Sequence, residues 1–156
     1  MARRLSKVSA VAGFTLIELM VTLVVAAILL AIAIPGYQTY IRQSRRTDAK
    51  TAVLDLAGRE ETLFSTKNTY SITPADVGYT GGAFPISVGS GYYTITVVAP
   101  AAAAGVNPTF LVTAVPVAGK TQANDAACQT FSVDQLGNQT ALNAAGADNT
   151  VTCWGN

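Results

Sequence analysis

The chain has 156 residues, with ten basic and nine acidic side chains, a net charge of +1 and no histidine. This length leaves room for one domain with an appended helix. Half of the residues are hydrophobic, and this bias is concentrated in the first quarter of the chain. The absence of histidine speaks against a zinc site at the two cysteines, and no glycine-rich phosphate loop follows a predicted strand. An enzyme is therefore the weakest functional class.

Residues 1–13 form a short basic segment ahead of a long apolar run. They contain Arg3, Arg4 and Lys7, no acidic residue, and a stretch of small residues that ends in Gly13. A secretory signal has its small-residue cleavage site after the apolar stretch, whereas here these residues precede it. Processing at Gly13 would remove only this leader. Seven basic and nine acidic side chains would remain, a balance of −2, so no overall basic field would attract nucleic acid.

The run from Phe14 to Ile34 contains a single charged residue, Glu18. A helix over residues 14–34 would span about 31 Å, which matches the hydrocarbon core of a bilayer. A carboxylate at that depth costs about 2.5–3.5 kcal/mol on insertion scales, so we expect it to have a partner. The alternative is an ordinary membrane anchor in which Glu18 reaches back to the interface.

The order of residues around this glutamate resembles the class III leader and mature N-terminus of type IV prepilins. The motif reads Gly13-Phe14-Thr15-Leu16-Ile17-Glu18-Leu19 and continues as a long apolar run. The segment from Ile34 to Ala49, with its Pro35-Gly36-Tyr37 and its arginines, is similar to the segment after the span in minor pilins. The resemblance covers roughly residues 1–70 and returns at the C-terminal cysteine pair, which ends in Cys153-Trp154.

The resemblance implies a structural subunit of a type IV pilus or pilus-like filament, of the minor kind. It implies cleavage between Gly13 and Phe14 by the prepilin peptidase and N-methyltransferase, with methylation of Phe14. Other pilin subunits and the inner-membrane assembly platform would be its partners. In a filament the new amine of Phe14 can approach Glu18 of a neighbouring subunit, and removing one partner of such a buried pair costs about 3–5 kcal/mol. The protein would cross the inner membrane once, with a periplasmic head, and then enter an extracellular filament.

Residues 35–67 are expected to continue the membrane helix as an amphipathic half. Pro35 cannot donate to the carbonyl of Ala31, so a kink or locally unwound stretch is expected around Ala31–Gly36. Beyond it, apolar residues recur at three- and four-residue steps, as on one face of a helix. These residues are Tyr37, Ile41, Ala49, Ala52, Val53, Leu56 and Leu63. The helix is expected to end near Ser65–Asn68.

Residues 68–156 are expected to form a small β-rich head. Thr73–Gly91 contains two prolines and five glycines and is predicted to be a loop region. The strands are predicted at Tyr92–Val98, at Thr109–Val115, and as a hairpin of Thr130–Val133 and Asn138–Leu142. An antiparallel sheet of three to four strands, with one face on the amphipathic half-helix, would bury the apolar residues of the head. The predicted fold class is α+β, the pilin fold.

Cys128 and Cys153 are the only cysteines, and an oxidising compartment would pair them. Closing that loop would stabilise the fold by about 3.5 kcal/mol on the chain-entropy model. The alternative is two free buried thiols in a cytosolic protein. Basic residues lie on both sides of the apolar run, so the positive-inside rule alone does not choose an orientation. The cleavage motif and the cysteines place the head in the oxidising compartment.

Two related filament proteins remain as alternatives, together with an anchored envelope protein that never polymerises. A type II secretion pseudopilin could hold calcium, but Asp125, Asp134 and Asp148 are scattered and read as solvated turn acids. We expect neither a metal nor another cofactor. A competence minor pilin would need several cations on one exposed face to bind DNA. After Lys67 the head has only Lys120, and the basic cluster of residues 42–50 is expected to pack against neighbouring subunits or lipid headgroups, which argues against direct DNA binding.

Overall fold

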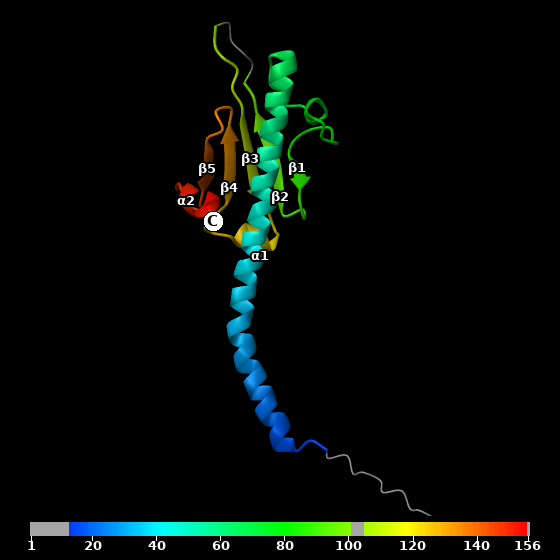
Figure 1. The fold of residues 1–156 in the computed structure, drawn as a ribbon, viewed down its shortest axis with the longest axis vertical. Helices are drawn as coiled ribbons and strands as arrows, with labels where there is room; N and C mark the ends of the chain where they lie inside the picture. Colours follow the sequence, from blue (N-terminus) through cyan, green and yellow to red (C-terminus); the bar gives the residue numbers. More distant parts are fainter. Residues whose placement is uncertain (1–12, 101–104, 156) are drawn as a thin grey trace, which may run out of the picture. The chain divides into compact units, whose positions relative to one another are not determined.

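The computed structural model describes residues 13–100 and 105–155, so residues 1–12 of the expected leader lie outside the described part. Figure 1 shows the elements. They are α1 (Leu16–Lys67), the 3-10 helix η1 (Pro74–Val77), β1 (Ile86–Val88), β2 (Tyr93–Val98), β3 (Leu111–Pro116), the 3-10 helix η2 (Thr121–Asn124), β4 (Thr130–Asp134), β5 (Gln139–Leu142) and α2 (Thr150–Trp154). The chain divides into two compact units between Thr39 and Tyr40.

The first unit consists of the apolar part of α1. Among the described residues this is the one helix long and apolar enough to cross a membrane, and no part of its apolar window is buried within the protein. The backbone stays helical from Ala31 to Gly36, so the locally unwound stretch that was one expectation there is absent. Pro35 lies inside the helix, and a kink at this residue stays a prediction.

The second unit contains a sheet of five antiparallel strands in the order β1-β2-β3-β4-β5 (Figure 1). The register aligns Ile86, Ile95, Ala114, Phe131 and Ala141 in one row across all five strands. The last four of these side chains are at most 1 % exposed. Large and small residues alternate along these four positions, which lets the opposing helix pack closely on them.

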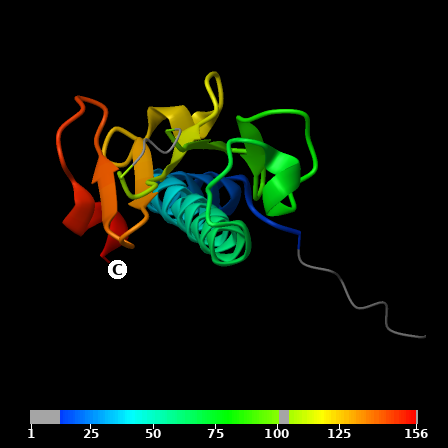
Figure 2. The same cartoon turned by 90° about the horizontal axis from the view of Figure 1, so that it is seen from above.

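Figure 2 shows that the second unit's part of α1 lies along one face of this sheet. The expected apolar face of the helix is confirmed from Ala49 to Leu63, because Ala49, Val53 and Leu56 are fully buried and belong to the same core as the sheet residues. The prediction is wrong for Tyr37, which is 66 % exposed. The helix ends at Lys67, within the expected range. Asn68 follows with a φ of 55°, a left-handed conformation that asparagine tolerates better than most residues and that stops a helix.

The predicted sheet of three to four strands lacks one strand, because β1 falls in the segment that was predicted to be a loop. Its three residues follow Pro85 and precede Gly89, so they give no alternating pattern long enough to recognise. They become a strand because β2 offers them a pairing edge, with Val88 opposite Tyr93. The other predicted strands are present with small shifts at their ends, and the α+β fold class is confirmed.

The C-terminal segment packs against the edge of the sheet that β5 forms. Cys128 and Cys153 form the predicted disulfide, with 5.7 Å between their Cα atoms. The bridge joins α2 to the segment before β4, and both cysteines are buried. Trp154 donates from its indole nitrogen to the carbonyl of Thr140 at 2.9 Å, so α2 is also held on β5.

Candidate assembly segment and head surface

The predicted assembly residues lie at and before the start of α1. Gly13 and Phe14 precede the helix, and Thr15 caps it. The hydroxyl of Thr15 accepts from the backbone N–H of Glu18 at 3.2 Å, as a capping residue does. Glu18 thus occupies the first turn, where a carboxylate is favoured by the helix dipole. Within residues 13–100 and 105–155, Glu18 takes part in no ion pair.

Large apolar side chains cover the helix around this carboxylate, and all of them are exposed. Phe14 is 81 % exposed and Leu16 79 %. The set continues with Ile17, Leu19, Met20, Val21, Leu23, Val24, Val25, Ile28, Leu29, Leu30, Ile32 and Ile34. Full burial of one such side chain stabilises by about 1.5–3 kcal/mol. The helix therefore has a strong tendency to enter lipid or to pack against other helices.

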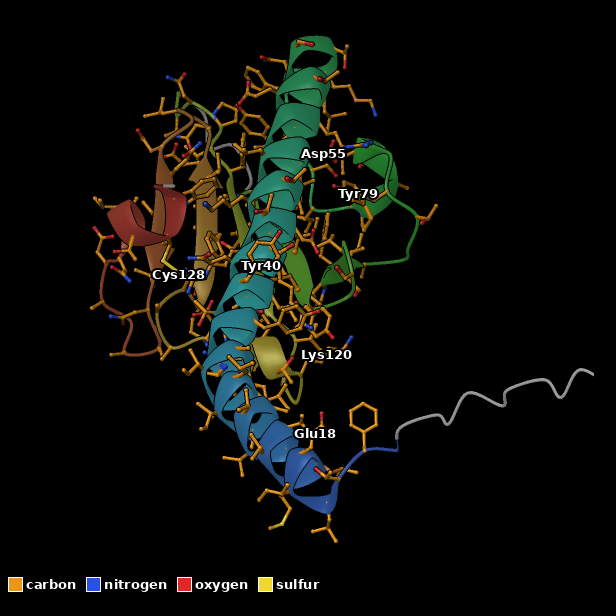
Figure 3. All side chains as sticks on the ribbon, turned by 60° about the horizontal axis from the view of Figure 1, so that its bottom comes forward. Glu18, Tyr40, Asp55, Tyr79, Lys120 and Cys128 are labelled. Carbon is orange, nitrogen blue, oxygen red and sulfur yellow. A yellow bond between two sulfur atoms is a disulfide. The ribbon has the colours of Figure 1, made fainter. Side chains whose placement is uncertain are left out.

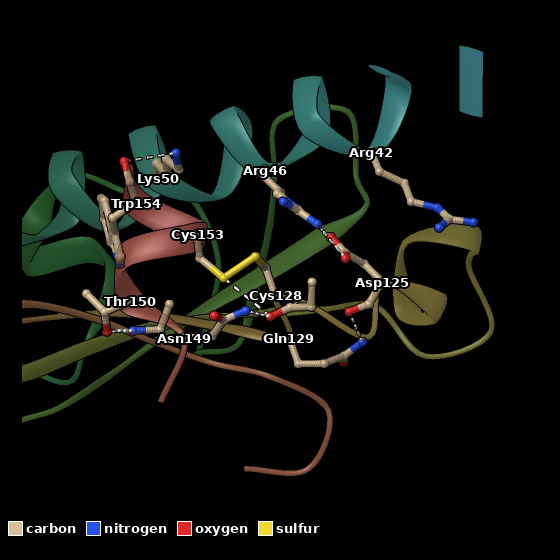
Figure 4. Close-up of a disulfide and its surroundings, with 12 residues drawn as sticks. Arg42, Arg46, Lys50, Asp125, Cys128, Gln129, Asn149, Thr150, Cys153 and Trp154 are labelled. Atoms are coloured by element: carbon tan, nitrogen blue, oxygen red, sulfur yellow. Dashed lines mark hydrogen bonds and ion pairs between the residues drawn. A yellow bond between two sulfur atoms is a disulfide. The ribbon is translucent and has the colours of Figure 1, made fainter. Parts of the chain in front are cut away.

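An ion pair clamps the head onto α1 (Figure 4). The guanidinium of Arg46 donates to both carboxylate oxygens of Asp125 at 2.7 Å, and the Asp125 side chain is only 3 % exposed. Gln122 donates from Nε2 to Asp125 Oδ2 at 3.2 Å and to the hydroxyl of Tyr93 at 2.9 Å. The hydrogen bonds that Arg46 donates to Asp125 raise the pKa of Arg46, and burial raises the pKa of Tyr93 to about 12. The prediction that Asp125 is a solvated turn acid is wrong.

Of the other two aspartates of that prediction, Asp134 is half-buried as the last residue of β4, and Asp148 is exposed just before α2. Asp134 Oδ1 accepts from the backbone N–H groups of Leu136 and Asn138 at 2.9 Å, and the hydrogen bond from the Asn138 side chain lowers its pKa. Asp148 accepts from Thr150. Over residues 13–100 and 105–155 no three histidine, cysteine or carboxylate side chains gather where a metal ion could bind.

The basic residues of positions 42–50 do not form one common surface. Arg46 is paired with Asp125, and Lys50 donates to the carbonyl of Trp154 at 3.4 Å (Figure 4). Burial, together with the nearby Arg46, lowers the pKa of Lys50. The prediction that this cluster packs against neighbouring subunits or headgroups is therefore wrong for these two residues, since both contact their own head.

Arg42 and Arg45 instead join Lys120 at one end of the head, and we call these three residues the basal cluster. The Arg45 guanidinium carbon lies 3.5 Å from the centroid of the Tyr92 ring, and Lys120 Nζ lies 5.3 Å from it. Arg45 also donates to the hydroxyl of Thr121 at 2.8 Å. Figure 3 shows Lys120 beside η2. Tyr92 thus holds two cations by cation–π contacts. Among the described residues neither cation has a carboxylate partner.

Sequence reasoning missed one buried carboxylate, Glu60, which is fully buried on the core side of α1. One oxygen accepts from the backbone N–H of Ser71 at 3.0 Å, whereas the other has no partner within the described residues. Burial raises the pKa of Glu60. The signal was available, because Glu60 lies four residues after Leu56 and three before Leu63, on the face that the apolar periodicity marks as buried.

Comparison with known protein families identifies the family of this chain. A family model described as "Type IV minor pilin ComP, DNA uptake sequence receptor" matches residues 35–132, which is more than half of the chain. The chain belongs to the type IV minor pilins. A model of the prokaryotic N-terminal methylation motif matches residues 9–34 of this pilin. The resemblance to type IV pilins that the sequence shows is confirmed.

Curated relatives of the pilin are themselves pilins and fimbrial proteins. It is 39 % identical over 67 residues to the type IV major pilin protein PilA of Myxococcus xanthus, covering 43 % of this chain and 30 % of that protein. It is 37 % identical over 90 residues to the fimbrial protein EcpC of Eikenella corrodens, covering 58 % and 55 %. It is 35 % identical over 102 residues to the type IV major fimbrial protein FimA of Dichelobacter nodosus, covering 58 % and 64 %. The pilin thus spans less than two thirds of the length of these relatives.

Proposed function

We propose that this pilin is a structural subunit of a type IV pilus or pilus-like filament, assembled by packing of its apolar helix. One observation carries the proposal: from Leu16 to Ile34 the helix exposes all of its large apolar side chains and places one carboxylate, Glu18, among them. Lipid can cover the side chains, but a desolvated carboxylate needs a cation. A second copy of the chain, cleaved after Gly13, would supply both an apolar surface and a positive charge at Phe14.

The cleavage proposal draws support from local structure. Gly13, Phe14 and Thr15 precede α1, so a prepilin peptidase would meet non-helical backbone at the cleavage site. The match to the N-terminal methylation motif covers this segment. We assign residues 1–13 to the leader and residues 14–34 to the membrane span and filament core. Residues 35–67 form the amphipathic half of the helix, and residues 68–156 form the head.

The proposed location follows from the same parts. The apolar helix would cross the inner membrane once before an assembly platform extracts it into the filament. The disulfide supports a periplasmic head, because a cysteine pair persists in an oxidising compartment. It also favours a pilus subunit over a calcium-holding type II secretion pseudopilin, whose heads usually lack such a bridge.

The charge pair is tested by Glu18→Ala, with Glu61→Ala as the matched control. Glu61 is an exposed carboxylate on the head part of α1 that accepts a hydrogen bond from the hydroxyl of Tyr70. We expect both variants in the membrane fraction at parental levels, and only Glu18→Ala to be depleted at least tenfold from sheared filaments. Filaments that incorporate Glu18→Ala as well as the control would refute the pairing.

Processing is tested on intact protein sheared from cells. The mass should lack residues 1–13, gain one methyl group on Phe14 and lose two hydrogens for the bridge between Cys128 and Cys153. A filament protein that still carries its leader would refute the proposed cleavage. This measurement does not depend on the charge pair, so the two parts of the proposal can fail separately.

A second candidate is DNA capture by the head, and one observation favours it: the matching family is described as a receptor for DNA uptake sequences. The basal cluster offers three cations and one aromatic ring, which is a small surface for phosphate contacts. Gel-shift measurements with the processed pilin in detergent, at low and high salt, separate the two functions. Binding to duplex DNA that weakens steeply with salt would support capture, and no shift at low salt would refute it.

A further inference from the structure

We infer that the basal cluster is a docking surface for anionic phospholipid headgroups, which orients the head on the membrane before assembly. This inference rests on the proposed insertion of the apolar helix into a bilayer. It adds a partner for Arg42, Arg45 and Lys120, to which the filament proposal gives no role.

The three cations are not neutralised by their own head. Both ion pairs within residues 13–100 and 105–155 belong to other arginines. Arg45 and Lys120 donate to neutral oxygens of Thr121 and Gly91. Figure 4 shows the Arg42 side chain extending near η2, without a marked interaction. The cluster therefore keeps its three positive charges available for an external anion.

The cations also share one surface. Arg42 and Arg45 are three residues apart on α1, so their side chains are neighbours on the helix. Gln122 of η2 approaches the backbone carbonyl of Arg42 at 3.5 Å, which places the loop that carries Lys120 beside this turn. Tyr92 lies within cation–π distance of both Arg45 and Lys120 and fixes their positions relative to each other.

The neighbouring carboxylate on α1 does not cancel this charge. Asp48 lies one turn after Arg45, but its Oδ2 accepts from the hydroxyl and the backbone N–H of Ser90 at 2.6 and 3.3 Å. Asp125 is held by Arg46. Asp125 is thus neutralised by Arg46, whereas Asp48 keeps its negative charge because its partners are neutral. Three cations against this one carboxylate leave the surface with a net charge of +2.

The length of the connecting chain places this surface at the membrane. Ile34 ends the apolar run and Tyr40 begins the second unit. Those six steps amount to about 9 Å as a helix and at most about 21 Å as a fully extended chain. Headgroups extend roughly 5–8 Å beyond each side of the hydrocarbon core. Along a helix Arg42 lies about 12 Å beyond Ile34, so its long side chain can reach back to headgroup phosphates. Arg45 lies about 17 Å beyond Ile34 and reaches the same layer where the span is tilted.

Tyr40, the first residue of the second unit, is also suited to the membrane interface. Tyr40 is 69 % exposed, and tyrosine is enriched where a membrane protein meets the interface. Each basic residue near an anionic leaflet strengthens association about fivefold, so three cations supply about a hundredfold. Lipid is favoured over DNA as the occupant, because the tether keeps this surface next to phospholipid for as long as the helix is inserted.

The test uses the full chain in lipid nanodiscs, with hydrogen exchange of the segments around Arg42, Tyr92 and Lys120 as the readout. One set of discs contains phosphatidylcholine alone, and the other contains phosphatidylcholine with phosphatidylglycerol. We expect exchange in these segments to slow severalfold in the anionic discs only. The variant Arg42→Gln/Lys120→Gln should lose this protection. The control Lys67→Gln, which removes an exposed cation from the last turn of α1, should keep it.

Equal exchange in both kinds of disc would overturn the inference, and so would protection that Lys67→Gln removes equally well. Duplex DNA added to phosphatidylcholine discs gives a further arm. If DNA protects these segments and phosphatidylglycerol does not, the cluster is a nucleic-acid surface and the lipid inference falls. A chain that fails to co-purify with either disc would overturn the membrane insertion itself, which is a different result from insertion without protection.

Discussion

The ion pair between Arg46 and Asp125 allows a quantitative prediction for Asp125→Asn. The substitution keeps the size of the side chain and an acceptor for Gln122, but it removes the negative charge. The structure shows two charge-assisted hydrogen bonds of 2.7 Å. Breaking a buried pair on one side costs about 3–5 kcal/mol. Because the Arg46 side chain is 16 % exposed, water can reach its charge, and the lower value of about 3 kcal/mol applies.

Thermal unfolding of the processed pilin in non-ionic detergent, followed by near-ultraviolet circular dichroism, measures this cost. For a folded unit of this size, 1 kcal/mol corresponds to about 4 °C in Tm, so we expect a decrease of about 12 °C. The matched control is Asp148→Asn, because Asp148 is exposed and a single side-chain oxygen accepts both of its hydrogen bonds from Thr150, which asparagine can also do. This control should shift Tm by no more than about 2 °C.

Equal shifts for the two variants would refute the view that this ion pair clamps the head onto the helix. A double variant, Arg46→Met/Asp125→Leu, examines the reason for the cost. If the loss in Asp125→Asn comes from an uncompensated buried cation, the double variant should recover part of the stability, since apolar replacement of both partners is often neutral. A double variant less stable than Asp125→Asn would show that the pair itself, and not the orphaned charge, carries the energy.

Three further changes address the core and its closure. Replacing both cysteines by serine should lower the free energy of unfolding by about 3.5 kcal/mol. Urea unfolding of this variant measures the loss, with the oxidised and the reduced parent as controls. Leu56→Ala should cost about 2–5 kcal/mol in the same assay, and the exposed Leu54→Ala less than about 1 kcal/mol. Burial raises the pKa of Glu60 in the folded protein. The contribution of Glu60 to the free energy of unfolding is therefore fully present below the pKa that it has in the unfolded chain, and it is lost as the pH rises through the raised pKa of the folded state. The Tm of Glu60→Gln relative to the parent should therefore increase from about pH 4 to pH 8, and a flat difference would contradict this reasoning.

Local patterns predicted most of the fold. The periodicity of Ala49, Val53 and Leu56 located the buried face of α1, and the β-branched run ending at Val98 located the central strand β2. The two cysteines were sufficient for the bridge, because no other pairing exists in the sequence. By contrast, the three residues of β1 carry too little pattern, and they adopt strand geometry only because β2 pairs with them.

The long-range polar contacts of the head could not be predicted, because they join residues that are distant along the chain. Asp125 and Arg46 are 79 positions apart, and nothing near either residue in the sequence marks the other as its partner. The contact of Arg45 with Tyr92 is of the same kind. The sequence shows correctly that Lys120 is the one basic residue after Lys67. It did not reveal that Lys120 folds back beside the two arginines of α1.

The two borders of the sheet have a consequence for a crowded fibre. On one border β1 is only three residues long, and on the other the backbone of β5 is engaged by Trp154, Thr150 and Asn149. Neither border leaves a long row of unpaired backbone amides. Such a row would allow strands of separate molecules to pair edge to edge. Heads displayed side by side at very high local density should therefore stay distinct and not merge into amyloid-like ribbons.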